Sequence, residues 1–141
     1  MKREDKELLI KDLCARLYYG VKVTTTNPAV ELGVISGISI ENKISVRTKH
    51  ADIVFDCTEV KPYLRPMSSM TEEESKEYRK TQITKWVKSV DCTYGGYYEH
   101  RDTLKTFDWL IAHHFDYRRL IEKGLAIEVT EENNPYNITE E

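Results

Sequence analysis

Apolar residues recur at helical spacing near the start of the chain. Leu9, Leu13 and Leu17 are four residues apart with charged residues between them, and this spacing is typical of an amphipathic α-helix. The pattern predicts a helix over residues 3–19. Gly20 is suited to end it, because glycine readily adopts the left-handed backbone found just after a helix C-terminus. We expect this helix to cover a sheet.

The next part of the chain, residues 21–64, changes to short runs of Val, Ile and Thr. Residues 42–43 and 50–52 separate these β-favouring runs, as tight connections would. Gly33 and Gly37 lie inside one run, where glycine is typical of a bend or a β-bulge. The pattern predicts four or five short antiparallel strands that form a small curled sheet or an SH3-like barrel. A plain meander packed on the first helix is the alternative.

Two later helices have recognisable starts. Thr71 followed by Glu74 matches a capping box, which predicts a helix that runs to about residue 80. A further helix is predicted over residues 103–114, because a polar residue in position to cap it precedes apolar residues at helical spacing.

A short partner helix is predicted to follow over residues 117–123. Asp116 is placed to cap it, and Gly124 is placed to end it. Phe115 before the cap and Leu120 four residues after it are positioned as a hydrophobic staple.

The segment "LAIEV" after this helix predicts a short strand at the sheet edge. Residues 131–141 carry only acidic charge and predict a frayed tail. The expected fold is therefore a single α+β domain over residues 1–130. It has a small curled antiparallel sheet, an N-terminal helix and a C-terminal helix pair.

Residues 81–102 have no clear periodicity and predict a loop with an aromatic tip around two adjacent glycines. This loop combines aromatic rings with cationic donors, namely Tyr94, Tyr97, Tyr98, His100 and Arg101. A base stacked on an aromatic ring contributes about 1–3 kcal/mol, and arginine binds phosphate through two hydrogen bonds. We therefore take these five residues as candidate ligand-binding residues. In the alternative interpretation, two of the tyrosines cover the core and keep their hydroxyls in water.

Arg118 and Arg119 form a second candidate site in the first turn of the predicted last helix. Exposed backbone N–H groups at such a position favour anions, so these arginines could neutralise a phosphate, with a further contribution from Arg65. The alternative is solvated surface charge that pairs with Asp116 and Glu122.

The adjacent histidines do not predict a metal site. Neighbouring side chains on a helix point about 100° apart, so His113 and His114 cannot chelate one ion from regular helix geometry. We expect His114 to be buried and hydrogen-bonded and His113 to lie at the surface. The residues predict no metal and no cofactor.

Composition narrows the function classes. The net charge of −3 over 141 residues implies no general attraction to long nucleic acid or to an anionic membrane. Three separated cysteines without a CxxC pair are typical of a reducing cytosol. The chain turns amphipathic from its start, so no signal peptide and no membrane span are expected. Cys92, His100 and Asp102 lie close in sequence, which leaves a small hydrolase as one alternative.

Three long phrases, "KELLIKDLCARLYYGVKV", "EVKPYLRPMSSMTEEE" and "FDWLIAHHFDYRRLIEKGLAIE", resemble a family of small uncharacterised proteins of gut Bacteroidales, their phages and mobile elements. The resemblance covers about half of the chain. Family members often carry glycine in place of Arg119 and vary across residues 80–102. The resemblance implies that the protein acts in the cytosol of a bacterial host. It implies no particular activity.

These observations favour a non-enzymatic phage or mobile-element accessory protein that acts by binding, with an anti-defence role as the most plausible purpose. The expected partner is a nucleotide-type signal or a host protein, and long nucleic acid is less favoured. An SH3-like module that binds RNA, DNA or a peptide is one alternative, and a hydrolase that uses Cys92 and His100 is another. A small sheet with exposed edges often pairs with a second copy, so a homodimer also stays open.

Overall fold

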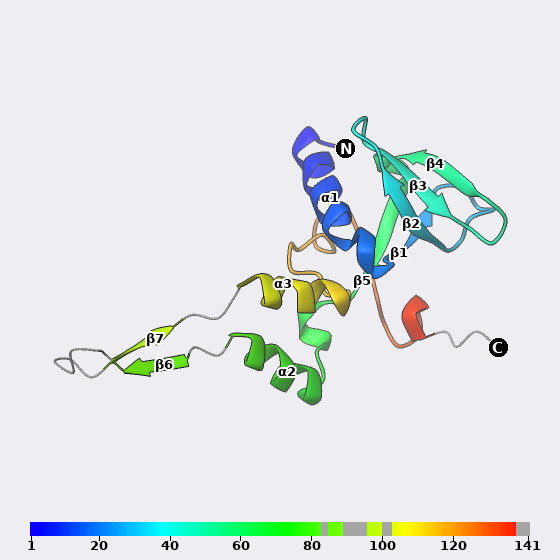
Figure 1. Ribbon diagram of the computed structural model, residues 1–141. Coiled ribbons are helices and arrows are strands. Elements are labelled where there is room, and N and C mark those ends of the chain that lie inside the picture. Colours follow the sequence, from blue (N-terminus) through cyan, green and yellow to red (C-terminus); the bar gives the residue numbers. More distant parts are fainter. Residues whose placement is uncertain (83–84, 89–95, 100–102, 138–141) are drawn as a thin grey trace.

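The structure is a computed structural model, and it describes residues 1–82, 85–88, 96–99 and 103–137 (Figure 1). The helices are α1 (Arg3–Arg16), α2 (Glu72–Gln82) and α3 (Thr103–Ala112). The strands are β1 (Lys22–Thr25), β2 (Gly33–Ile38), β3 (Lys43–Arg47), β4 (Asp52–Asp56), β5 (Val60–Leu64), β6 (Lys85–Lys88), β7 (Gly96–Glu99) and β8 (Ile127–Glu128). The fold is α+β, as predicted.

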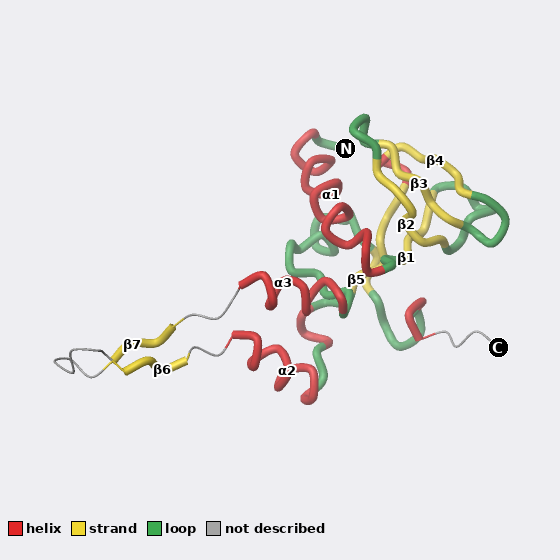
Figure 2. Tube along the Cα trace, in the orientation of Figure 1, coloured by secondary structure: helices red, strands yellow, loops and turns green. Residues whose placement is uncertain are grey.

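The main sheet has six strands in the order β4-β3-β2-β1-β5-β8 (Figure 2). The first five strands pair antiparallel, as predicted, whereas β8 joins the edge parallel to β5. The sheet is therefore mixed, and "LAIEV" does supply an edge strand. The sheet does not close into a barrel, because β4 and β8 stand at opposite edges, so the SH3-like alternative is wrong.

Gly33 allows β2 to lie close to β3, and Gly37 lies where the pairing of these two strands is irregular. A Cβ at Gly33 would collide with the Val46 side chain and lie 3.2 Å from the carbonyl oxygen of Arg47. The register of β2 against β3 shifts between Ile35 and Gly37, which is the predicted bulge.

Helix α1 covers the sheet with one apolar stripe. Leu9 and Leu13 are fully buried and join a core whose sheet residues include Val21, Val23, Ile35, Ile44, Val46 and Val60. The helix continues as a 3₁₀ turn over Leu17–Tyr19 and ends at Gly20, which has a φ of 69°. The predicted helix and its glycine stop are confirmed. Among the described residues, the helices are too short or too polar to cross a membrane.

Helix α2 begins at the predicted capping box. The Thr71 N–H donates to Glu74 Oε1 and the Glu74 N–H donates to Thr71 Oγ1, both at 3.1 Å. Glu74 also accepts two hydrogen bonds from the Arg65 guanidinium, at 2.6 and 2.8 Å, which ties α2 to the end of β5. The rings of Tyr78 and Trp109, 5.6 Å apart, join α2 to α3.

The predicted helix over residues 117–123 is absent, since these residues form turns. Arg119 has a φ of 61°, which lies outside the right-handed helical region. Asp116 nevertheless acts as a cap, because its carboxylate accepts the N–H groups of Leu120 at 2.9 Å and Ile121 at 3.0 Å. In place of the predicted helix pair, the structure has α3 followed by a turn that Asp116 caps.

Part of the predicted frayed tail is docked on the sheet. Residues Pro135–Asn137 form a 3₁₀ turn. The Tyr136 hydroxyl donates to the Tyr63 carbonyl at 2.7 Å and accepts the Lys22 N–H at 3.1 Å. The hydroxyl thus bridges two neighbouring strands, so the prediction of fraying is wrong for this stretch.

A buried ion pair connects α1 to the chain that follows α3. Arg16 Nε donates to Asp12 Oδ2 at 2.6 Å, and neither side chain has any exposed area. Arg16 Nη2 donates to the carbonyl oxygen of Phe115, also at 2.6 Å. Burial raises the pKa of Asp12, and the charge of Arg16 beside it opposes that shift. The guanidinium therefore satisfies a carboxylate and a backbone carbonyl that both lie out of water.

Removal of this guanidinium should destabilise the protein strongly. In Arg16→Met the Asp12 carboxylate stays buried and keeps only the more distant Arg118, at 3.6 Å, and we expect the free energy of unfolding to fall by about 3–5 kcal/mol. Arg3→Met is the matched control, because Arg3 forms the same i,i+4 pair with Glu7 on an exposed surface, where such a pair contributes about 0–1 kcal/mol. Urea unfolding measures both variants, and equal losses would contradict this role for Arg16.

Candidate functional site

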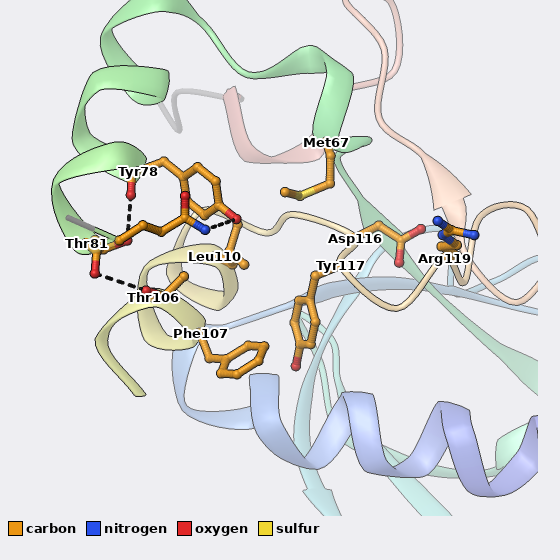
Figure 3. A pocket seen from close by; sticks show the side chains of 10 residues that line it. Met67, Tyr78, Thr81, Thr106, Phe107, Leu110, Asp116, Tyr117 and Arg119 are labelled. Carbon is orange, nitrogen blue, oxygen red and sulfur yellow. Dashed lines mark hydrogen bonds between the residues drawn. The ribbon is translucent and has the colours of Figure 1, made fainter. Parts of the chain in front are cut away.

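A cleft of about 600 Å³ opens between α2, α3 and the turn that follows α3 (Figure 3). Its lining residues come from three separate parts of the chain: Met67, Tyr78, Thr81, Gln82, Thr106, Phe107, Leu110, Asp116, Tyr117 and Arg119. Five of these lining residues are aromatic or aliphatic, and the other five are polar or charged. This combination is typical of small-ligand sites.

One wall of the cleft is made by Phe107 and Tyr117. Their ring centroids lie 5.5 Å apart with the planes tilted by 53° (Figure 3). Phe107 is 45% exposed, although the helical spacing of α3 predicts that it faces the core with Leu110 and Ile111. Leu110 and Ile111 are buried as expected. The prediction of burial is therefore wrong for Phe107, and part of its ring is exposed at the cleft.

The opposite wall is held by one hydrogen bond between α2 and α3 and by two hydrogen bonds within α2. The Thr106 hydroxyl donates to the Thr81 carbonyl at 3.3 Å, and the Thr81 hydroxyl donates to the Tyr78 carbonyl at 2.6 Å. The Gln82 amide donates to the Tyr78 hydroxyl at 3.0 Å (Figure 3). These bonds fix the positions of polar groups that a ligand would meet.

The turn at the inner end of the cleft is fixed by backbone contacts. The Arg65 N–H donates to the His114 carbonyl and the Asp116 N–H donates to the Arg65 carbonyl, both at 2.8 Å. The Arg65 guanidinium lies 4.2 Å from the centroid of the Phe115 ring. His114 and Arg119, with φ values of 63° and 61°, stand at the two ends of this turn. Positive φ is common for histidine but unfavourable for arginine, and the conformation of Arg119 persists only where surrounding contacts enforce it.

The two predicted phosphate-binding arginines have different surroundings. Arg118 Nε lies 3.6 Å from the buried Asp12 carboxylate, and its guanidinium lies 5.2 Å from the Tyr117 ring centroid. Arg119 is exposed and lines the cleft. Arg65, the suggested third cation, is paired with Glu74. The structure therefore brings only Arg119 of these three residues to the cleft.

The tyrosine-rich candidate site lies largely outside the described residues. Tyr97 and Tyr98 belong to β7, where they pair with Val87 and Trp86 of β6, rather than to the predicted loop. Tyr94, His100 and Arg101 lie outside the described residues, and so does Cys92 of the hydrolase alternative. The predicted roles of these residues stay predictions.

The adjacent histidines differ from their predicted environments. His113 is half-buried, its ring is stacked on Trp109 at 4.1 Å, and its Nδ1 lies 2.8 Å from the Trp109 carbonyl. The His114 ring is stacked on Tyr136 at 3.7 Å. Its Nδ1 is buried, and the described residues offer it no hydrogen-bond partner, so the predicted hydrogen bond is missing.

His114 lines a second, more polar cavity of about 720 Å³ beside the docked tail. Burial lowers the pKa of His114 to about 4, and the positive charges of Arg16 and Arg65 act in the same direction. Within the described part of the chain, no group of three or more His, Cys, Asp or Glu side chains is arranged to hold a metal ion.

Sequence reasoning missed two features, the buried ion pair of α1 and the cleft itself. Asp12 and Arg16 share the buried stripe of α1 with Leu9 and Leu13, at the spacing i, i+3, i+4, i+7. That spacing was the available signal for a buried ion pair. The cleft itself has no comparable signal, because its walls are contributed by segments far apart in the chain.

Comparison of the chain with protein-family models, curated proteins and solved structures found no match.

Ionisation of His114 should make stability depend on pH. Its folded-state pKa of about 4 lies below the ordinary value of 6.5, so on acidification the unfolded chain binds a proton before the folded protein does. The free energy of unfolding should fall by about 1–2 kcal/mol from about pH 7 to about pH 5, after allowance for partial exposure.

His114→Asn should remove most of this slope, because asparagine does not titrate and tolerates a positive φ. Urea unfolding of both proteins at several pH values measures the difference. Parallel pH profiles for the variant and the unmodified protein would show that His114 is not the group responsible.

Proposed function

We propose that this protein is a non-enzymatic binding protein that sequesters a small ligand with a planar ring in the cleft between α2 and α3. The observation that carries this proposal is the exposed aromatic wall of Phe107 beside Tyr117. Stacking a base on an aromatic ring contributes about 1–3 kcal/mol. A solvent-exposed Phe in an apolar cleft is the kind of surface that such a ligand would cover.

The size and rigidity of the cleft support a small ligand. Its volume of about 600 Å³ falls within the range of about 300–1,000 Å³ that is common for small-ligand sites. Both walls are held in place by contacts within the chain, at Thr106–Thr81 on one side and at Phe107–Tyr117 on the other. Binding would thus require little ordering of the site, which favours affinity.

The engaged state of Asp116 favours binding over catalysis. Each of its carboxylate oxygens accepts a backbone N–H, from Leu120 and from Ile121. These two hydrogen bonds give Asp116 a structural role as the cap of the turn. Asp116 thus shapes the turn that presents Tyr117 and Arg119 to the cleft.

The resemblance to proteins of Bacteroidales phages and mobile elements adds a biological setting to this proposal. In that setting, a cytosolic accessory protein would withdraw a nucleotide-type signal from the host, for example a signal used in defence. A host protein is the second candidate partner, because an exposed aromatic residue in a cleft also matches a protein-binding hot spot.

The proposal predicts that Phe107→Ala weakens nucleoside binding. Loss of one stacking surface should lower the affinity by about tenfold, for a stacking contribution of about 1–3 kcal/mol. Isothermal titration calorimetry with adenosine, guanosine, cytidine and uridine measures the effect. Leu104→Ala is the matched control, because Leu104 lies one turn earlier on α3, is 67% exposed and is not a lining residue of the cleft.

Two results would contradict the proposal. In the first, none of the four nucleosides binds the unmodified protein at concentrations up to about 1 mM. In the second, a nucleoside binds but Phe107→Ala and Leu104→Ala affect it equally, which would place the site elsewhere.

A further inference from the structure

We infer that Arg119 makes the cleft selective for a ring-bearing ligand with a phosphate group, that is, for a nucleoside monophosphate over the neutral nucleoside. This inference rests on the proposed function, because it concerns the same cleft. It adds the chemical class of the ligand and names the residue that determines it.

Arg119 presents a positive charge that forms no ion pair with the described residues. Its side chain is exposed and lines the cleft (Figure 3). Asp116, three residues earlier, is committed to the N–H groups of Leu120 and Ile121. Among the ion pairs formed by the described residues, none includes Arg119. A guanidinium in this state is well suited to bind a phosphate, because its planar fork matches two phosphate oxygens.

The neighbouring Arg118 shows the opposite arrangement. Its guanidinium lies 3.6 Å from the Asp12 carboxylate and stacks near the Tyr117 ring. The two consecutive arginines therefore point to different partners, one to a buried carboxylate of α1 and the other to the cleft. Arg118 has a partner in Asp12, whereas the residues that the structure describes form no ion pair with Arg119.

The backbone at Arg119 strengthens the case. The described residues contain five positions with positive φ, and four of them carry residues suited to it: Gly20, Asn42, His114 and Gly124. Arg119 is the exception, with a φ of 61°. An unfavourable backbone conformation at a cleft is a reason to look for a function of the side chain. Here that side chain supplies a cation to the lining of the cleft.

The turn also fixes the backbone from which the Arg119 side chain extends. Backbone hydrogen bonds of Arg65 with His114 and Asp116 fix the start of the turn, and the Asp116 carboxylate fixes its end. A charged group on a rigid turn loses less conformational freedom on binding than one on a free loop. The phosphate would therefore bind Arg119 while the base stacks at Phe107 and Tyr117.

The test compares AMP with adenosine by isothermal titration calorimetry. We expect the unmodified protein to bind AMP about tenfold more tightly than adenosine, and this preference to shrink as salt is added. Arg119→Gly should abolish the preference, and Arg119→Lys should retain part of it. Glycine suits the backbone at this position, so the melting temperature of Arg119→Gly should be unchanged or higher.

Lys123→Ala is the matched control for net charge. Lys123 is exposed and lies four residues further along the chain, and it is not a lining residue of the cleft. Its variant should keep the full preference for AMP.

Equal affinities of the unmodified protein for AMP and adenosine would overturn the inference and leave the proposed function in place. A preference for AMP that survives in Arg119→Gly, or that disappears equally in Lys123→Ala, would also overturn it. If neither compound binds, both the inference and the proposed function fail.

Discussion

The buried guanidinium of Arg16 is the interaction on which the arrangement of this protein depends. Two charges without contact to water are tolerated only when each has close partners, and here Arg16 holds Asp12 on its own helix and the carbonyl of Phe115 on the turn after α3. The same helix presents Leu9 and Leu13 to the sheet. One face of α1 therefore joins the sheet core to the segment that carries the cleft.

That segment can hold an unfavourable backbone conformation because contacts from other parts of the chain enforce it. His114 and Arg119 both have positive φ, yet between them Arg65 pairs with the backbone on both sides of Phe115 and stacks on its ring. Arg65 also holds Glu74 of α2, so the same side chain places the second wall of the cleft. Arg65 thus helps to hold α2, which has no buried residue of its own.

The parts of the fold that depend on local chemistry could be predicted from the sequence. The first helix with Gly20 after it, the capping box at Thr71, the five antiparallel strands and the bulge near Gly37 all follow from spacing and residue type. The errors arose where distant contacts override local preference. The helix after Asp116 gives way to a turn that α1 and β5 hold from outside, and barrel closure depends on strand pairing that no local pattern encodes. The cleft could not be predicted for the same reason, since three separated segments form it. Arg119, a candidate from the sequence, lines this cleft, and its role in binding stays a prediction.

The central claim is that the cleft beside α3 is where this protein binds its ligand. The most direct measurement is a heteronuclear NMR titration with AMP that follows the side-chain signals of Phe107, Tyr117 and Arg119. The account predicts that these signals shift together along one saturable curve, while those of His114 and Tyr136 in the second cavity stay in place. Saturable shifts at the second cavity, with the cleft signals unmoved, would contradict it.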